Sequence, residues 1–128
     1  MNFTPFQQLF NFNPSIQNQW ALLGDTPEKD GYLSSQLKEQ VRKTLAQKNG
    51  CQYCKAKGMP DPSIYGEKTT VCTAYAEAFL HSKGQLSPKV TEVLNDYLSK
   101  EERDELIVFI CFTTASQYIG ALMQLLPE

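Results

Sequence analysis

The chain has 128 residues, a formal net charge of −2 and 41% hydrophobic residues. This length indicates a single domain, residues 1–128, which is large enough for a hydrophobic core but too short for two. A slightly acidic balance without a basic run argues against nucleic acid as the main partner. Residues 1–5 lack the basic-then-apolar order of a secretory signal, so we expect a cytoplasmic protein. In that compartment a close cysteine pair more often indicates redox catalysis or metal binding than a disulfide scaffold.

The first half of the sequence predicts helices joined by short loops. Thr4-Pro5 and Asn13-Pro14 each place a capping residue before a proline suited to the first helical position. The second of these helices is predicted to end at Gly24, before a polar loop over residues 25–31. Ser35 is the candidate cap of the next helix, which runs to about residue 48. Its apolar stripe repeats at every fourth position, at Leu37, Val41 and Leu45.

The second half continues the helical pattern. Apolar residues recur at helical spacing from Val71 to about Ser82, and Gly84 marks the exit. Ser87-Pro88 begins another helix, and residues 99–102 form a capping box before the last one. The sequence contains no strand pattern. We therefore expect an all-α domain of about six helices.

The last predicted helix is apolar nearly all round from residue 106 to residue 123. Its length alone admits a membrane span. Polar residues interrupt the run, however, so we expect a buried core helix that also contacts a neighbouring subunit, and no membrane insertion. The interrupting residues are Thr113, Thr114, Ser116 and Gln117, and the residues small enough to let another helix approach are Ala115, Ser116 and Gly120.

The stretch Asn49-Gly50-Cys51-Gln52-Tyr53-Cys54 carries the clearest chemistry in the chain. Two cysteines separated by two residues can close a small disulfide or bind a metal. Asn49 and Gly50 are suited to turn the chain before a helix start, where free N–H groups stabilise a thiolate. Lys55 and Lys57 add positive charge nearby. Cys51, nearest the helix start, is the candidate for exchange with partner proteins, whereas the sequence leaves open which cysteine attacks a peroxide.

Together with Phe12-Asn13-Pro14 and Glu39, this stretch resembles the carboxymuconolactone decarboxylase superfamily, and most closely its alkyl hydroperoxidase D-like (AhpD-like) thiol branch. The most specific part is a glutamate twelve residues before the first cysteine of an Asn-Gly-Cys-x-Tyr-Cys string. The likeness covers about residues 11–126. It implies an all-α AhpD-like fold that assembles as trimers or hexamers. It also implies thiol-dependent reduction of peroxides or of partner disulfides.

Residue by residue, the resemblance assigns Cys51 and Cys54 as the redox pair and Glu39 as the relay carboxylate. The family's histidine, four residues after the second cysteine, is replaced here by Gly58. This departure matters because histidine is the side chain suited to moving protons near neutral pH. Either the relay runs through water and Glu39, or another residue substitutes, or the protein is a poor peroxidase.

Simpler interpretations of these residues stay open. On a helical wheel, Glu39 lies opposite the apolar stripe, which is typical of a surface carboxylate paired with Arg42 or Lys43.

A second alternative concerns the other cysteines. Cys51, Cys54, Cys72 and His81 have the stoichiometry of a zinc site but lack a second close pair. Otherwise His81 is expected at the surface, and Cys72 and Cys111 are expected to act as small hydrophobic residues on apolar helical faces.

These observations predict a homo-oligomeric, thiol-dependent antioxidant oxidoreductase. Its substrates would be a hydroperoxide and a thiol or dithiol reductant, which can be a protein, and it would need neither cofactor nor metal. One alternative is a decarboxylase-type lyase acting on a small cyclic acid, which leaves the cysteine pair without a role. The other is a non-enzymatic zinc-binding or structural module.

Overall fold

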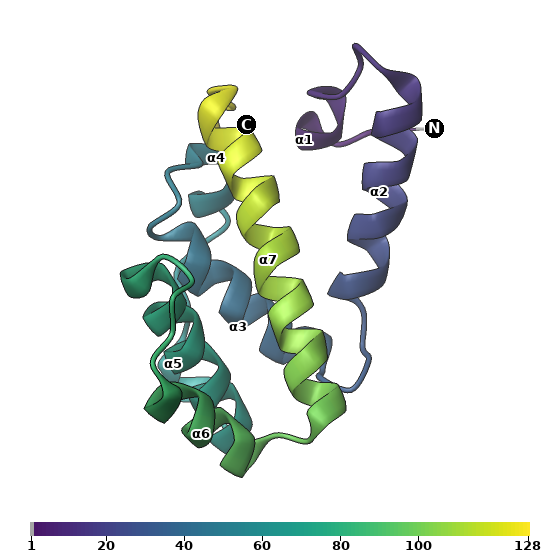
Figure 1. Ribbon diagram of the computed structural model, residues 1–128. Coiled ribbons are helices and arrows are strands. Elements are labelled where there is room, and N and C mark those ends of the chain that lie inside the picture. The colour runs from purple at the N-terminus through teal and green to yellow at the C-terminus, as the bar shows by residue number, and fades with distance from the viewer. Residues whose placement is uncertain (1) are drawn as a thin grey trace.

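The computed structural model describes residues 2–128, so Met1 of the expected 1–128 domain lies outside the described residues. The described chain is all-helical, as predicted, with seven α-helices and one short 3-10 helix (Figure 1). The elements are α1 (Pro5–Gln8), α2 (Pro14–Glu28), α3 (Ser35–Ala46), α4 (Gln52–Lys55), η1 (Pro62–Ile64), α5 (Glu67–Ser82), α6 (Pro88–Tyr97) and α7 (Lys100–Leu122).

Capping side chains define most helix starts, and the sequence predicted most of them. Thr4, Asn13 and Ser87 each accept hydrogen bonds from the first turn of the following helix. Ser99 forms the predicted capping box with Glu102 at the start of α7. The cap of α3 is Ser34, one residue earlier than expected. Each such cap contributes about 1 kcal/mol to helix stability.

Helix α2 is longer than predicted, because the expected end at Gly24 and loop from residue 25 are wrong. The helix continues to Glu28 with Pro27 in its last turn. Gly24 faces the Phe112 ring, and a Cβ built on it would lie 3.4 Å from that ring. The packing of α2 against α7 therefore continues the helix past Gly24, through a contact with Phe112 that an alanine Cβ would also make at an ordinary distance.

Helix α3 lies between α5 and α7 and supplies the centre of the core (Figure 1). Its predicted stripe is confirmed, because Leu37, Val41 and Leu45 are at most 5% exposed. Burial of such side chains is the main favourable term in folding this domain. The remaining core residues come from the chain before α3 and from α5, α6 and α7: Leu33, Cys72, Ala76, Leu94, Leu98, Leu106, Phe109 and Ile110.

The α1–α2 segment packs on a different side of α7 from α5 and α6 (Figure 1). A row of aromatic rings joins it to α7. The Trp20 ring lies between Phe10 and Phe112, with 5.4 Å between centroids on each side. The Trp20 indole N–H also donates to Ser116 Oγ at 3.2 Å. These contacts fix how far α2 stands from α7 and so set one wall of the candidate site.

A buried ion pair fixes the connection between α2 and α3. Lys38 Nζ lies 2.8 Å from Glu105 Oε1 on α7 and also donates to the Lys29 carbonyl. Glu105 in turn accepts the backbone N–H groups of Tyr32 and Leu33, each at 3.0 Å. Desolvation opposes ionisation of Glu105, but these hydrogen bonds together lower its pKa. The Glu105 carboxylate thereby holds the loop between α2 and α3 against α7.

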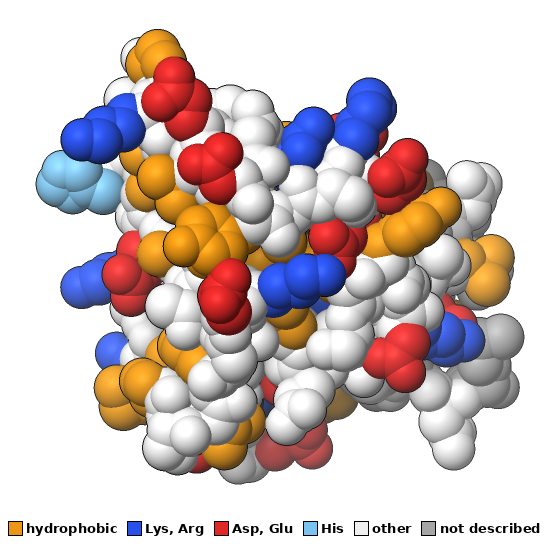
Figure 2. All heavy atoms as spheres, turned by 90° about the horizontal axis from the view of Figure 1, so that it is seen from below, with side chains coloured by type: hydrophobic (Ala, Val, Ile, Leu, Met, Phe, Trp, Pro, Cys, Tyr) orange, Lys and Arg blue, Asp and Glu red, His pale blue; other side chains and the backbone are white. Residues whose placement is uncertain are grey.

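Helix α7 is less buried than predicted for a core helix. It is long and apolar enough to span a bilayer by length and composition, and 33% of that apolar window is buried within the chain. A core helix of a soluble protein passes the same test. Its exposed apolar residues are Ile107, Val108, Tyr118 and Leu122. The view from below in Figure 2 shows acidic and basic side chains interspersed with apolar ones.

Candidate redox site

The cysteine pair stands at the start of the short helix α4. Cys51 is its N-cap, and the Cys51 sulfur accepts the backbone N–H of Cys54 at 3.2 Å. Gly50, with a φ of +82°, turns the chain into this cap, a conformation that favours glycine. Cys51 and Cys54 form a disulfide whose Cα atoms are 5.2 Å apart, within the range that disulfides require. Of the two outcomes that this spacing allows, a disulfide or a metal site, the close pair therefore forms the disulfide.

The two sulfurs differ in exposure. Cys51 is 0% exposed and lies under Gly120 of α7, where a Cβ would be only 2.5 Å from its sulfur. Cys54 is partly exposed and lines a cavity. The expectation that Cys51 exchanges with partner proteins does not fit this burial in the disulfide form. An incoming molecule reaches Cys54 first.

The cavity beside Cys54 has a volume of about 630 Å³ and lies between α2, α4 and α7. Its apolar walls come from α1, α2 and α7. They include Phe6, Ala21 and the rings of Trp20 and Phe112. Its polar lining includes Ser116 and Gln117, and its charged groups come from α2, α3 and the chain after α4. Small-molecule sites in proteins combine apolar walls with a few polar groups in this way.

The charged residues that line this cavity are Asp25, Glu28, Arg42 and Lys57, and Glu39 lines the neighbouring space on α3. Arg42 joins α3 to the cysteine pair, because its Nη1 donates to the Cys54 carbonyl at 3.4 Å. Lys57 Nζ lies 4.8 Å from the centre of the Tyr53 ring. Arg42 and Lys57 therefore bring two positive charges to the cavity that Cys54 lines.

Glu39 lies on the exposed side of α3 and pairs with Arg42. Arg42 Nε donates to Glu39 Oε1 at 2.8 Å, and the guanidinium makes a second bond to the same oxygen. The Glu39 side chain is 46% exposed. This is the arrangement expected for a surface carboxylate on a helix. Glu39 reaches the cysteine pair only through Arg42, which contacts both.

Gly58, at the position of the resembled family's histidine, lies beyond the end of α4. Its φ is +119°, a conformation that residues with a side chain rarely adopt. A Cβ at this position would point toward Lys43, 3.9 Å from Lys43 Cε and Nζ. A histidine substituted here would therefore be strained and would not take the place of a helical histidine.

The zinc set considered from the sequence is not assembled. Within residues 2–128 no group of three or more His, Cys, Asp or Glu side chains stands close enough to hold a metal. Cys72 is buried in the core, and burial raises the pKa of its thiol to about 12. His81 is exposed near the end of α5, as expected. Cys111 is exposed on α7, so its predicted burial is wrong.

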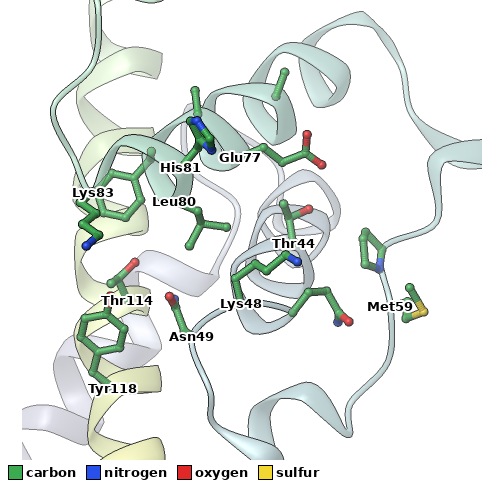
Figure 3. Close-up of a pocket in the computed structure, with 15 residues that line it drawn as sticks. Thr44, Lys48, Asn49, Met59, Glu77, Leu80, His81, Lys83, Thr114 and Tyr118 are labelled. Atoms are coloured by element: carbon green, nitrogen blue, oxygen red, sulfur yellow. The ribbon is translucent and has the colours of Figure 1, made fainter.

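A second and wider groove, of about 1250 Å³, lies between α3, α5 and α7 (Figure 3). Leu80, Asn49 and Thr114 surround its inner end. Thr114 Oγ1 is buried there without a hydrogen-bond partner. The Asn49 amide donates to Gln117 at 2.8 Å, and Gln117 lines the cavity beside Cys54. A buried pair of amides thus lies between the groove and the cysteine cavity.

Glu28 was not predicted from the sequence, because the end of α2 was expected at Gly24, four residues too early. Glu28 is the last residue of α2 and lines the cavity with Cys54. The spacing of Trp20, Gly24 and Glu28, four residues apart, is the signal that could have found it. Residues at this spacing share one face of a helix, and Trp20 marks that face as the one toward α7.

The fold and the site together define a small all-helical protein with a Cys-x-x-Cys disulfide beside a charged, aromatic-walled cavity. Comparison with models of protein families and with curated proteins gives no match.

Proposed function

We propose that this protein is a thiol-dependent oxidoreductase that reduces hydroperoxides or partner disulfides through Cys51 and Cys54. The observation that carries the proposal is the asymmetry of the disulfide, with Cys54 on a cavity and Cys51 buried behind it. A redox pair needs one accessible sulfur for the substrate and one protected sulfur to resolve the intermediate. Cys72, in contrast, is buried and has a strongly raised thiol pKa, which makes it unsuited to this role.

The reaction proceeds from the reduced pair. The Cys54 thiolate attacks one peroxide oxygen, so that an S–O bond forms, the O–O bond breaks and the alcohol leaves after gaining a proton. The Cys51 thiol then attacks the sulfur of the Cys54 sulfenic acid, which forms the disulfide and releases water. An external dithiol reduces the disulfide by exchange and is itself oxidised. Attack of Cys54 on a partner disulfide follows the same order, with a thiol as leaving group.

We also propose that the chain is an AhpD-like member of the carboxymuconolactone decarboxylase superfamily. The support is the Asn-Gly-Cys-x-Tyr-Cys string, the glutamate twelve residues before it and the all-helical fold. Homo-oligomers are part of this proposal. Five of the exposed residues of α7 repeat at alternating spacings of three and four, the pattern of helices that pack on one another. They are Val108, Cys111, Ala115, Tyr118 and Leu122.

The test is dithiol-dependent consumption of hydrogen peroxide and of cumene hydroperoxide by the full chain. We expect Cys54→Ser to abolish turnover and Cys51→Ser to stop it after one oxidation of Cys54. Cys111→Ser is the matched control, because it removes an exposed helical cysteine outside the pair. Turnover that survives in Cys54→Ser would overturn the proposal.

A further inference from the structure

Glu28 and Cys54 face the same cavity from opposite walls of the site. Glu28 ends α2, whereas Cys54 lies on α4, and both line the 630 Å³ space. Their link is two shared cationic neighbours. Arg42 donates to the Cys54 carbonyl, Lys57 follows α4 closely in the chain, and both exert a charge effect on Glu28. Glu28 and Asp25 are the two carboxylates that line the cavity with Cys54. Asp25 is paired with Lys29 at 2.8 Å, which leaves Glu28 as the one of these two without an ion pair among the described residues.

The charges that face Glu28 come from three parts of the chain. Lys57 acts most strongly and Arg42 next, and both favour the carboxylate. Glu39 on α3 and Asp25 on α2 disfavour it. From α4 the cavity receives Tyr53, whose phenol is neutral at physiological pH, and α7 contributes only uncharged residues to its lining.

We propose that Glu28 carries the proton between the Cys54 thiol and the leaving group of the redox reaction. This proposal rests on the proposed oxidoreductase function. Glu28 takes the proton from the Cys54 thiol, directly or through a water in the cavity, which leaves a thiolate and a neutral carboxyl. When Cys54 attacks the hydroperoxide, the S–O bond forms and the O–O bond breaks. The same proton then passes from Glu28 to the alkoxide, which leaves as the alcohol.

The surroundings of Glu28 suit both halves of this transfer. Loss of water around the carboxyl raises its pKa above the ordinary value, and this effect exceeds the opposing one of Lys57 and Arg42. Glu28 as a whole residue is nevertheless exposed, which leaves a path for proton exchange with solvent. A carboxyl whose pKa moves toward neutrality accepts and donates protons more evenly at physiological pH.

Glu39, the carboxylate predicted from the sequence, is less suited to this role. Both its hydrogen bonds to Arg42 use the same oxygen, so the carboxylate is already engaged in an ion pair on α3. It also lines the neighbouring space on the α3 surface and not the cavity of Cys54. Its place in the site is to orient Arg42, whose other nitrogen reaches Cys54.

The experiment compares Glu28→Gln with Glu39→Gln in the full-length, reduced protein. The first readout is the rate at which iodoacetamide alkylates Cys54 as pH is varied, with the modified peptide identified by mass spectrometry. The second is the single-turnover rate with cumene hydroperoxide at neutral pH. Thermal unfolding of each variant is measured alongside.

The two readouts should move in opposite directions in Glu28→Gln. Removal of a negative charge near Cys54 favours its thiolate, so the alkylation profile shifts to lower pH. Removal of the proton carrier slows the peroxide step by about 100-fold, a typical effect of losing a general acid. Glu28→Asp should recover part of the rate. Glu39→Gln removes a charge that is linked to Cys54 only through Arg42. The pH profile of Cys54 alkylation should therefore shift less in Glu39→Gln than in Glu28→Gln.

Two results would overturn the role of Glu28. One is an unchanged alkylation profile together with an unchanged peroxide rate in Glu28→Gln. The other is a fall of both rates with a lower unfolding temperature, which is what a structural role predicts. Wild-type protein that shows no peroxide or disulfide reduction would refute the proposed function instead. The alkylation profile would still report whether Glu28 and Cys54 are coupled, and an unshifted profile would then overturn this proposal too.

Discussion

Gly120 of α7 lies directly against the sulfur of Cys51. A Cβ built on Gly120 would stand 2.5 Å from Cys51 Sγ and 3.7 Å from Cys54 Sγ, so only glycine lets α7 approach the disulfide this closely. The contact seals Cys51 from solvent and leaves Cys54 as the accessible sulfur. The difference in exposure between the two cysteines therefore depends on a residue far from them in sequence.

We predict that Gly120→Ala destabilises the protein by about 1–3 kcal/mol, the usual cost of overpacking a well-filled site. Gly24→Ala is the matched control, since it is also a helical glycine but its added Cβ meets Phe112 at an ordinary 3.4 Å. Gly24→Ala should raise the free energy of unfolding by up to about 1 kcal/mol, because alanine has a higher helix propensity than glycine. Denaturant unfolding measures both, and equal effects of the two substitutions would contradict the contact.

We predict that Thr114→Val stabilises the protein. The Thr114 hydroxyl is buried without a partner, and an unsatisfied buried group of this kind costs about 1–3 kcal/mol. Valine has nearly the same shape and no polar group. Thr44→Val is the control, because the Thr44 hydroxyl is buried and donates to the Gln40 carbonyl at 2.8 Å. Thr44→Val should lower the free energy of unfolding by about 1 kcal/mol, whereas Thr114→Val should raise it. Two losses of similar size would show that Thr114 finds a partner in solution.

The four cysteines should react in three different ways after mild oxidation. Cys51 and Cys54 should be recovered as a linked peptide. Exposed Cys111 should be alkylated in the native protein. Cys72 should resist alkylation until the chain unfolds, because burial raises the pKa of its thiol to about 12 and its thiolate is absent near neutral pH. Mass spectrometry with and without denaturant decides this, and rapid native labelling of Cys72 would contradict its place in the core.

Glu102 should make the protein sensitive to acid. The hydrogen bond from Lys68, and then that from the Ser99 backbone N–H, lower the pKa of Glu102 in the folded state. A depressed pKa gives stability that is present above the unfolded value of about 4.5 and is lost as pH falls through the folded value. Glu102→Gln should therefore flatten the loss of stability below about pH 4.5. Exposed Glu101→Gln is the control and should keep the wild-type profile.

The proposed oligomer can be tested on the exposed side of α7. Val108 is 59% exposed within the single chain, and we expect a second copy to cover it. Light scattering at micromolar concentration should give a multimer for the wild type and a smaller species for Val108→Asp. Ile64→Asp, an exposed apolar position on η1, should leave the mass unchanged. A wild-type mass of one chain would refute the oligomer.

Local chemistry allowed much of the fold to be predicted from the sequence. A cap such as Asn13 or Ser99 acts on N–H groups within its own first turn, and the stripe of α3 follows from helical periodicity. The disulfide was predictable as one of two outcomes, because two residues of separation bring the sulfurs of Cys51 and Cys54 within bonding reach. These features depend on neighbours within a few residues.

Only the tertiary structure decided which cysteine of the pair is exposed. Gly24 carries a helix-ending signal, but close packing against Phe112 outweighs it, and the longer α2 brings Glu28 to the cavity. Burial of Cys51 requires α7 to lie on it, through a contact between residues 69 positions apart. Packing free energy accumulates over contacts between distant segments, and no local pattern records which segments meet. The sequence therefore determined that a close cysteine pair could form a disulfide, and the packing of α2 and α7 determined which sulfur is exposed and which charged residues share its cavity.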